Sequence, residues 1–356
     1  MNAMHDLKTL YHQFEQLKIA EKLSYSIGEK VIIVPSEITC LKSTKRSSIY
    51  KLLLRRSNNY YPVIFKIYNS TAYKNEVEIN IYKKAYTILK EFLPRIYLIE
   101  TVKNETWIFM EFVNQIRGQL TFSPAHFQFI IPSIAKLHGQ TFENRFKKNK
   151  SVWKGWLPVY TSTSMKKNRV KYMNQTVDLL NAAIKDKRIS DIIKPYYPSL
   201  IKLYNKGPDF FPELVENGSS ITHGDLHMQN ICSKNVTQNT PWNIQFIDWE
   251  SAKYSSVWFD MVVLVELLLG FRKDWQQNAE EIRTQCVKIY VNEMKKYGIT
   301  FTTDPMTLYK MAYLQRTLER GLHTQLRRIS DNREGELLSY HLEKISTWGR
   351  ELGIYE

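Results

Sequence analysis

The first third of the chain contains almost no glycine, and this excludes two ways of binding a nucleotide. Gly28 is the only glycine before Gly118. The GxGxxG fingerprint of dinucleotide-binding folds and the GxxxxGK[ST] loop of P-loop proteins are therefore both absent from this part. Any loop that covers a phosphate there must use small polar residues instead.

Cysteines and long apolar runs are also scarce. Cys40, Cys232 and Cys286 are widely spaced and form no CxxC pair, which argues against a disulfide framework and a structural zinc site. The N-terminal segment MNAMHDLKTLYHQFEQ has no apolar core of a signal peptide. The longest apolar run, Met261 to Leu269, is interrupted by Glu266 and is too short to span a bilayer. We therefore expect a soluble, cytoplasmic protein without a membrane association.

Basic residues, by contrast, are abundant. The 356-residue chain has 50 Lys and Arg against 35 Asp and Glu, a formal net charge of +15. This charge favours anionic ligands, and a nucleic-acid-binding protein is one alternative, which predicts steeply salt-dependent binding to polyanions. The basic residues are scattered, however, with only short runs such as 145–150, which is typical of a solvated surface. Nucleic acid is therefore a disfavoured partner.

The periodicity of apolar residues changes near Val113 and indicates two lobes of an α+β protein. The first lobe, 1–113, begins with a helix inside 1–28 and continues as a small, largely antiparallel sheet that carries one main helix. The second lobe, 114–356, is mainly helical. The expected strands are 31–34, 48–54, 61–68, 95–100, 106–113, 231–232 and 243–247, with a hairpin turn at Asn58-Asn59, and the expected helices are 5–24, 71–91, 130–138, 170–187, 192–205, 279–297 and 306–328.

Two carboxylates in residues 219–250 carry the strongest functional signal. Asp225 lies in His223-Gly-Asp-Leu-His-Met-Gln-Asn230, which matches the kinase catalytic-loop template HxDLxxxN at its four fixed positions. Asp248 ends an apolar strand and is followed by Trp249. In a kinase-type site the first Asp accepts the proton of the acceptor hydroxyl, and the Asn and second Asp hold Mg²⁺ on the nucleotide phosphates. The pattern thus predicts phosphoryl transfer.

A buried lysine upstream fits the same chemistry. Lys66 lies in the apolar strand around Val63-Ile-Phe-Lys-Ile-Tyr68, where a lysine is costly unless it is paired. Glu78 shares the apolar face of the following helix, whereas Glu76 falls on its polar face, so we favour Glu78 as the partner and leave Glu76 as the alternative. Such a pair would hold the ammonium against nucleotide phosphates.

Two further segments are candidates for nucleotide contacts. The stretch from Cys40 to Ser48 could cover the phosphates through backbone N–H groups and the hydroxyls of Ser43 and Thr44. A plain exposed loop is the alternative interpretation. The end of the first lobe, at Met110, Glu111 and Val113, is where a two-lobed kinase offers backbone groups to the adenine edge.

These segments resemble the aminoglycoside phosphotransferase and choline kinase-like superfamily, which has a protein-kinase-like fold. The resemblance is carried by residues 223–230, by Ile247-Asp-Trp-Glu250, by Phe259-Asp260 at the start of an apolar helix, and more loosely by Ile134-Ala-Lys-Leu-His138. It implies transfer of a phosphoryl group from ATP or GTP to a small-molecule hydroxyl. It also implies Asp225 as the base, Asn230 and Asp248 as Mg²⁺ ligands, and Lys66 with Glu78 as the phosphate clamp.

The spacing after Asp248 independently favours a small acceptor. Protein kinases need a long activation segment before an A-P-E landmark, but here only residues 249–259 separate Asp248 from Asp260 and no A-P-E follows. Residues 140–220 and the C-terminal helices would then form the acceptor walls. Glu250 could touch an acceptor, especially one that bears an amine, or could form a salt bridge. His223 would orient the loop, and His227 would orient it or contact the acceptor.

Other classes of protein stay open at this stage. One alternative is a metallohydrolase, because the spacing His223-x-Asp225-x-His227 resembles a cluster of metal ligands. The remaining histidines, however, offer no second pair of ligands. A kinase-like binding or regulatory module without turnover is another alternative. An aminoglycoside, choline or a related amine, a sugar and a nucleoside-like metabolite are all acceptable acceptors, and no pattern indicates an oligomeric state.

Overall fold

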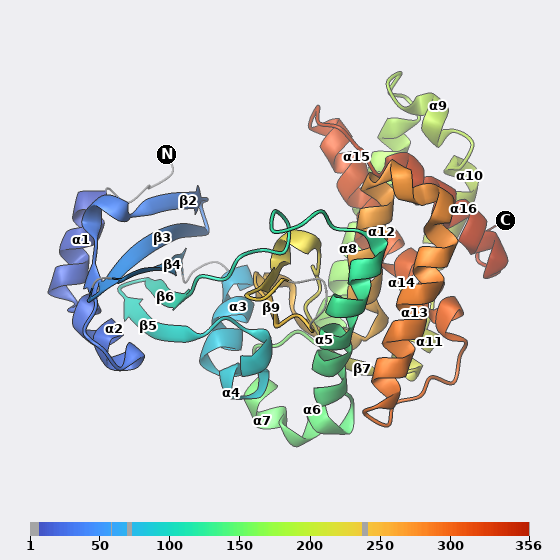
Figure 1. Cartoon of the computed structure of the whole chain (residues 1–356). Coiled ribbons are helices and arrows are strands. Elements are labelled where there is room, and N and C mark those ends of the chain that lie inside the picture. Colours follow the sequence, from blue (N-terminus) through green and yellow to red (C-terminus); the bar gives the residue numbers. More distant parts are fainter. Residues whose placement is uncertain (1–6, 58, 70–72, 237–240, 356) are drawn as a thin grey trace. The chain divides into compact units, whose positions relative to one another are not determined.

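The computed structural model describes residues 7–57, 59–69, 73–236 and 241–355. These residues form two compact units (Figure 1). The first takes in the described residues of Met1–Thr121, Ser151–Trp156 and Met228–Ser251, and the second those of Phe122–Lys150, Leu157–His227 and Ala252–Glu356. The division into lobes after Val113 stays a prediction, because each unit combines several segments of the chain.

An antiparallel sheet forms the centre of the first unit. Its order is β1-β3-β4-β6-β5, with β2 paired to β3. The long β3–β4 hairpin follows from the alternation of buried and exposed residues, and Arg56 pairs with Asn59 across its turn. Asn58, the other expected turn residue, lies outside the described residues. The strands are β1 Ile32–Ile33, β2 Thr39–Ser43, β3 Ser47–Arg56, β4 Asn59–Asn69, β5 Ile96–Val102 and β6 Glu105–Glu111.

Two N-terminal helices cover one face of this sheet (Figure 1). The expected single helix over 5–24 is wrong, because Lys18 adopts a left-handed backbone with φ 52° and separates α1 (Leu7–Gln16) from α2 (Ile19–Ile27). The two helices bury apolar side chains against alternate residues of β3, β4 and β6. This core includes Leu10, Phe14, Ile19, Leu23, Tyr50, Leu52, Leu54, Val63, Phe65, Ile67, Trp107 and Phe109.

The remaining elements of the first unit include two helices and a two-stranded ribbon. The expected helix over 71–91 is α3 (Tyr73–Lys83) followed by the short α4 (Tyr86–Leu89). A two-stranded antiparallel ribbon pairs β8 (Ile231–Ser233) with β9 (Ile244–Phe246). Both ribbon strands are buried, and the ring of Phe246 stacks on Phe92, which follows α4. The ribbon is thus tied to the α4 region by an aromatic contact.

The second unit is mainly helical. Its longer helices are α5 (Phe127–Gln140), α8 (Thr163–Ala183), α12 (Trp258–Phe271), α13 (Ala279–Lys295), α14 (Pro305–Arg316) and α16 (Leu338–Glu351). Helices α12, α13 and α14 pack side by side, with α5 against α13 and α16 against α14 (Figure 1). The shorter helices are α6 (Asn144–Lys148), α9 (Ser190–Ile193), α10 (Tyr197–Tyr204), α11 (Glu213–Glu216) and α15 (Leu322–Ser330), and α7 (Lys150–Trp153) falls where the two units meet in sequence.

Two features of the second unit differ from the sequence-based expectation. The expected helix over 306–328 is interrupted by a π-helical turn, Thr317–Gly321, between α14 and α15. In addition, β7 (Ser219–Thr222) pairs antiparallel with β10 (Lys253–Ser256), a ribbon that the apolar pattern did not predict. Strand β7 leads directly into the segment that carries Asp225.

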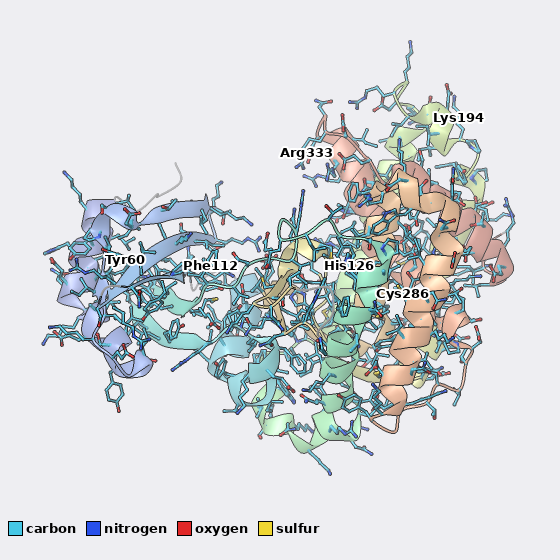
Figure 2. All side chains as sticks on the ribbon, viewed as in Figure 1. Tyr60, Phe112, His126, Lys194, Cys286 and Arg333 are labelled. Atoms are coloured by element: carbon cyan, nitrogen blue, oxygen red, sulfur yellow. The ribbon has the colours of Figure 1, made fainter. Side chains whose placement is uncertain are left out.

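A buried ionic network explains the charge that interrupts the apolar run of α12. Glu266 is paired with Arg283 of α13 at 2.7 Å, and both side chains are almost fully buried. Tyr309 and Tyr340 also donate their hydroxyls to the Glu266 carboxylate. In Figure 2, Cys286 lies among these helices, while Lys194 and Arg333 lie at the rim of the unit. In the described part of the chain, no helix combines the length and apolar character needed to cross a membrane.

Candidate active site

A buried ion pair joins the sheet of the first unit to α3. The Lys66 ammonium lies 2.8 Å from a carboxylate oxygen of Glu78, and the two side chains are 10% and 4% exposed. Because side chains alternate along β4, Lys66 points away from the core that faces α1 and α2. The Tyr82 hydroxyl donates to Glu78 at 3.0 Å, and the ammonium lies over the ring of Tyr68. Glu76, the alternative partner, is exposed.

Asn230 and Asp248 are adjacent in the structure at one end of the β8–β9 ribbon. Asn230 immediately precedes β8, Asp248 follows the residue after β9, and the Ile247 N–H donates to the Asn230 carbonyl at 3.0 Å. The Asn230 side chain is buried, whereas Asp248 is half-buried. Asp248 has a left-handed backbone with φ 66°, a conformation that is uncommon outside glycine and that often occurs at functional sites.

The electrostatics of two tyrosines connect Asp248 with the ion pair. Burial raises the pKa of Tyr68 and Tyr82 well above its ordinary value, and the charges of Glu78 and Asp248 raise it further. Both carboxylates therefore act on the same two phenol groups. Helix α3, which carries Glu78, also packs against the 3₁₀ turn Trp249–Ser251 directly after Asp248, so the lysine, the glutamate and the aspartate lie in one charged cluster within the first unit.

The donor set at this cluster suits Mg²⁺. Magnesium prefers oxygen ligands and is usually held by one or two protein groups together with water and substrate phosphates. The Asn230 amide oxygen and the Asp248 carboxylate supply two such oxygens. Among the residues that the structure describes, no three His, Cys, Asp or Glu side chains are grouped as metal ligands. A magnesium ion held by these two oxygens would complete its coordination with water and substrate phosphates.

The expected phosphate-covering loop is shorter than the sequence indicates. Residues 40–43 of the proposed 40–48 loop belong to β2, and β3 begins at Ser47. The Ser43 and Ser48 hydroxyls lie 2.9 Å apart across the hairpin, and the Thr44 hydroxyl bonds the Ser47 backbone. The hydroxyls of Ser43 and Thr44 therefore stabilise the hairpin in this structure.

Arg46, at the tip of this hairpin, is a residue that the sequence analysis did not select. Its guanidinium lies 2.9 Å from the carboxylate of Glu250, with side chains 45% and 27% exposed. Of the two roles open for Glu250, the structure therefore displays the salt bridge. The two adjacent basic residues Lys45-Arg46 in a turn are the signal that could have identified it.

The three proposed adenine-edge residues lie at the end of β6 and just beyond it. Met110 is buried in the sheet, and Glu111 is the last residue of β6. The Glu111 carboxylate pairs with Lys234 at 2.6 Å. Val113 is half-buried and lies beyond the strand, next to Phe112. The Lys51 ammonium lies over the Phe112 ring, 4.9 Å from its centroid, and Phe112 is labelled in Figure 2.

The segment with Asp225 lies in the second unit and is held in place by hydrogen bonds to its backbone groups. It follows β7, and Gly224 has φ 81°, a conformation that a glycine adopts without strain. The Asp225 side chain is 52% exposed, and a carboxylate oxygen lies 3.7 Å from His227 Nε2. His223 is fully buried, and its Nδ1 accepts a hydrogen bond from the Asp225 N–H at 3.4 Å.

Asp260 anchors this segment. Its carboxylate accepts the backbone N–H groups of His223 at 2.7 Å and Gly224 at 2.8 Å, and lies 3.2 Å from His138 Nε2. Burial alone would raise the pKa of Asp260, but the hydrogen bond and charge of His138, with the charge of His223 and the Gly224 N–H, hold it below its usual range. The sequence identified Asp260 only as a landmark, because no local pattern shows that it bonds a backbone 36 residues away.

The predicted site residues are therefore distributed over both units. The first unit contains the nucleotide and metal candidates, which are Ser43, Thr44, Lys66, Glu78, Met110, Glu111, Val113, Asn230, Asp248 and Glu250. The second contains His223, Asp225 and His227. The chain itself joins the two sets, since Asp225 precedes Asn230 by five residues.

Comparison with known proteins identifies the family. The model of the ecdysteroid kinase-like family matches residues 47–298. The chain belongs to this family. Among solved structures, the fold is similar to that of an ethanolamine kinase from Plasmodium vivax, with a TM-score of 0.53 and 16% identity over 88% of this chain and 83% of that one. A search of curated protein sequences gives no match.

A second solved structure supports the same fold. The choline kinase from Cryptosporidium parvum Iowa II has a TM-score of 0.50 and 13% identity over 89% of this chain and 91% of that one. These similarities confirm the expected α+β, kinase-like fold. The protein is thus a kinase-like phosphotransferase by family.

Proposed function

We propose that this protein transfers the terminal phosphoryl group of ATP or GTP, with Mg²⁺, to a hydroxyl of a small molecule. The observation that carries the proposal is the charged cluster of the first unit. The Lys66–Glu78 pair is buried, α3 packs against the 3₁₀ turn directly after Asp248, and the backbone of Asn230 is bonded to the residue before Asp248. A buried ion pair adds little net stability compared with apolar residues of the same size, because desolvation of the two charges offsets their attraction. A functional role therefore accounts for the Lys66–Glu78 pair better than stability does.

Each side chain of the cluster would bind a different part of the nucleotide or its metal ion. Lys66 would hold phosphate oxygens, and Glu78 would fix the direction of the ammonium. Asn230 and Asp248 would hold Mg²⁺, which neutralises charge on the transferring phosphoryl group when it is bound. Backbone groups near Val113 would contact the base. The β2–β3 hairpin, with Ser43 and Thr44 at its turn, would cover the phosphates.

Asp225 is the proposed general base. Its side chain is half-exposed, so it can reach the proton of an incoming hydroxyl, while its backbone is held through His223 and the Asp260 carboxylate. A base must be within hydrogen-bond reach of the proton it accepts, and a rigid loop provides that geometry at low entropic cost. His227, beside Asp225, would orient the carboxylate or contact the acceptor.

A small acceptor fits the short interval after Asp248. The residues before α12 are occupied by a 3₁₀ turn, Trp249–Ser251, and by β10. These ordered elements leave little chain for a peptide-docking segment. The names of the family and of the two similar structures mention an ecdysteroid, ethanolamine and choline, and these compounds have in common only a hydroxyl group.

Acceptor-dependent release of nucleoside diphosphate tests the proposal. A panel of sugars, amino alcohols, aminoglycosides, nucleosides and steroids would be assayed with Mg·ATP and Mg·GTP, comparing wild type with Asp225→Asn. We expect turnover of at least one acceptor, with loss of about 10²-fold or more in the variant. Equal turnover in both proteins would contradict the role of Asp225. Absence of Asp225-dependent turnover across the panel would favour a kinase-like binding module.

A further inference from the structure

Arg316 and the strand that carries Lys253 contact the Asp225 segment, and Arg320 lies one helical turn beyond Arg316. The Arg316 guanidinium donates to the Gly224 carbonyl at 2.9 Å, next to Asp225 itself. Lys253 lies on β10 opposite Thr222, three residues before Asp225. Arg320 follows Arg316 by four residues in the π-helical turn, a type of turn that recurs at functional sites.

Carboxylates offset these cations only in part: Glu319 and Asp260 raise the pKa of Lys253 without forming an ion pair with it. Among the described residues, no Asp or Glu lies within ion-pair distance, 4.0 Å, of the side chains of Lys253, Arg316 or Arg320. The two guanidinium groups instead lie over aromatic rings, Arg316 over Phe259 at 5.6 Å and Arg320 over Tyr172 at 4.5 Å. Their positions are therefore fixed by packing without neutralisation of their charge.

The one carboxylate in the same turn is already engaged. Glu319 accepts hydrogen bonds from the Tyr160 hydroxyl and from Gln315, and lies 3.4 Å from Arg169. Burial raises the pKa of Glu319 despite these partners. All three contacts are made by Oε1, and the raised pKa weakens Glu319 as a counterion for an amine on an acceptor.

The titration of two neighbours is consistent with an excess of positive charge. Burial, and then the charge of Arg316, lowers the pKa of Lys253 to about 8, although Glu319 and Asp260 act in the opposite direction. Burial lowers the pKa of His323, and the charges of Arg320 and Arg327 lower it further. An anion beside these groups would relieve the repulsion between the cations.

We infer that Lys253 and Arg316, with Arg320 nearby, bind an anionic group of the acceptor, a carboxylate, sulfate or phosphate, while Asp225 takes the proton of its hydroxyl. This inference rests on the proposed function and specifies the class of its acceptor. An acceptor whose only charged group is an amine would meet three cations that form no ion pair in the described part of the chain and that Glu319 and Asp260 offset only in part. The site therefore selects an anionic hydroxy compound over its neutral or aminated analogue.

Acceptors with one carbon skeleton test this selectivity. Glucose, glucuronate and glucosamine would be compared as substrates, together with glycerol and glycerate. We expect kcat/KM for the anionic member to exceed that of the neutral member about tenfold or more, the size of a charge-assisted hydrogen bond. Lys253→Met should reduce this ratio about tenfold, whereas Lys288→Met, which removes an exposed lysine of α13, should leave it unchanged. A preference for glucosamine, or an unchanged ratio in Lys253→Met, overturns the inference.

A binding measurement tests whether Lys253 binds an anion even if none of these acceptors is turned over. The full chain would be ¹³C-methylated at its lysines, the Lys253 signal assigned by its loss in Lys253→Arg, and its pH titration repeated with sulfate. We expect sulfate to raise the pKa of Lys253 from about 8 toward 10.5 and to leave the Lys288 signal unchanged. A Lys253 titration that does not respond to sulfate overturns the inference.

The two experiments separate this inference from the proposed function. Turnover that depends on Asp225 but shows no preference for an anionic acceptor refutes only the inference. A sulfate effect on Lys253 without nucleotide-dependent turnover refutes only the proposed function. If Lys253→Met instead raises KM for Mg·ATP and leaves the acceptor ratio unchanged, Lys253 contacts the nucleotide phosphates and the inference is wrong.

Discussion

Replacing Lys66 by Met should reveal whether the buried ion pair is a structural or a functional feature. The Lys66 ammonium is the cation paired with Glu78 at 2.8 Å, in a setting where the two side chains are 10% and 4% exposed. Its removal would leave a buried carboxylate with only the Tyr82 hydroxyl among its described hydrogen bonds. We therefore expect Lys66→Met to lower the free energy of unfolding by about 3–5 kcal/mol, the usual cost of breaking a buried pair.

The double variant Lys66→Met with Glu78→Gln should recover most of this stability. It removes both charges, and the Gln carbonyl can still accept from Tyr82. Neutral replacements of buried pairs are often as stable as the pair itself. The double variant should nevertheless lose about 10²-fold or more in kcat/KM, because an electrostatic contact with the phosphates is gone.

Reversible urea denaturation of the full chain measures the first effect, and a matched surface pair provides the control. Lys22 and Glu100 are also 2.8 Å apart, but their side chains are 40% and 24% exposed. Lys22→Met should therefore cost at most about 1 kcal/mol. If Lys66→Met costs no more than Lys22→Met, or if the double variant is less stable than Lys66→Met alone, the account of this pair is wrong.

Three further predictions concern single residues. Asp225→Asn should retain Mg·nucleotide affinity by isothermal calorimetry while kcat falls about 10²-fold or more, and a matching loss of affinity would contradict its role as the base. Asp260→Asn should lower the free energy of unfolding by about 1.5–3 kcal/mol, because it weakens charge-assisted hydrogen bonds to the backbone of His223 and Gly224, and urea denaturation without such a loss would refute this anchor. Burial lowers the pKa of His341 to about 4, so the unfolded state binds its proton first as the pH falls below 6.5. Stability should therefore fall between pH 6.5 and 4 by at most about 1.4 kcal/mol per pH unit for this group, and His341→Gln should flatten that slope in urea denaturation at several pH values.

The sequence predicted the parts of the fold that depend on local periodicity. The strands that contain Lys66 and Glu111 alternate between buried and exposed residues or form continuous apolar runs, so their positions were confirmed within a few residues. The break at Lys18 was missed because the helical spacing of apolar residues continues across it. The β7–β10 ribbon was missed because both strands are short and rich in serine, without an apolar pattern.

The candidate site could be predicted where a motif fixes both residue type and spacing. The segment from His223 to Asn230 is such a motif, and helical spacing alone favoured Glu78 over Glu76. Contacts between distant segments could not be predicted, because no local pattern encodes them. The salt bridge between Arg46 and Glu250 spans 204 residues, and the hydrogen bond from Arg316 to Gly224 spans 92. The roles of these residues in catalysis stay predictions.

The central claim is that this chain moves a phosphoryl group from a nucleotide to a hydroxyl with Asp225 as the base. The most direct test is ³¹P NMR of wild type with Mg·ATP or Mg·GTP and an acceptor found in the panel, followed until a phosphomonoester signal appears. The account predicts that this signal grows as the terminal phosphate signal of the nucleotide declines. It also predicts that Asp225→Asn forms the phosphomonoester at a rate lower than that of wild type by about 10²-fold or more. Phosphomonoester formation by Asp225→Asn at the wild-type rate would contradict the account, as would release of inorganic phosphate alone.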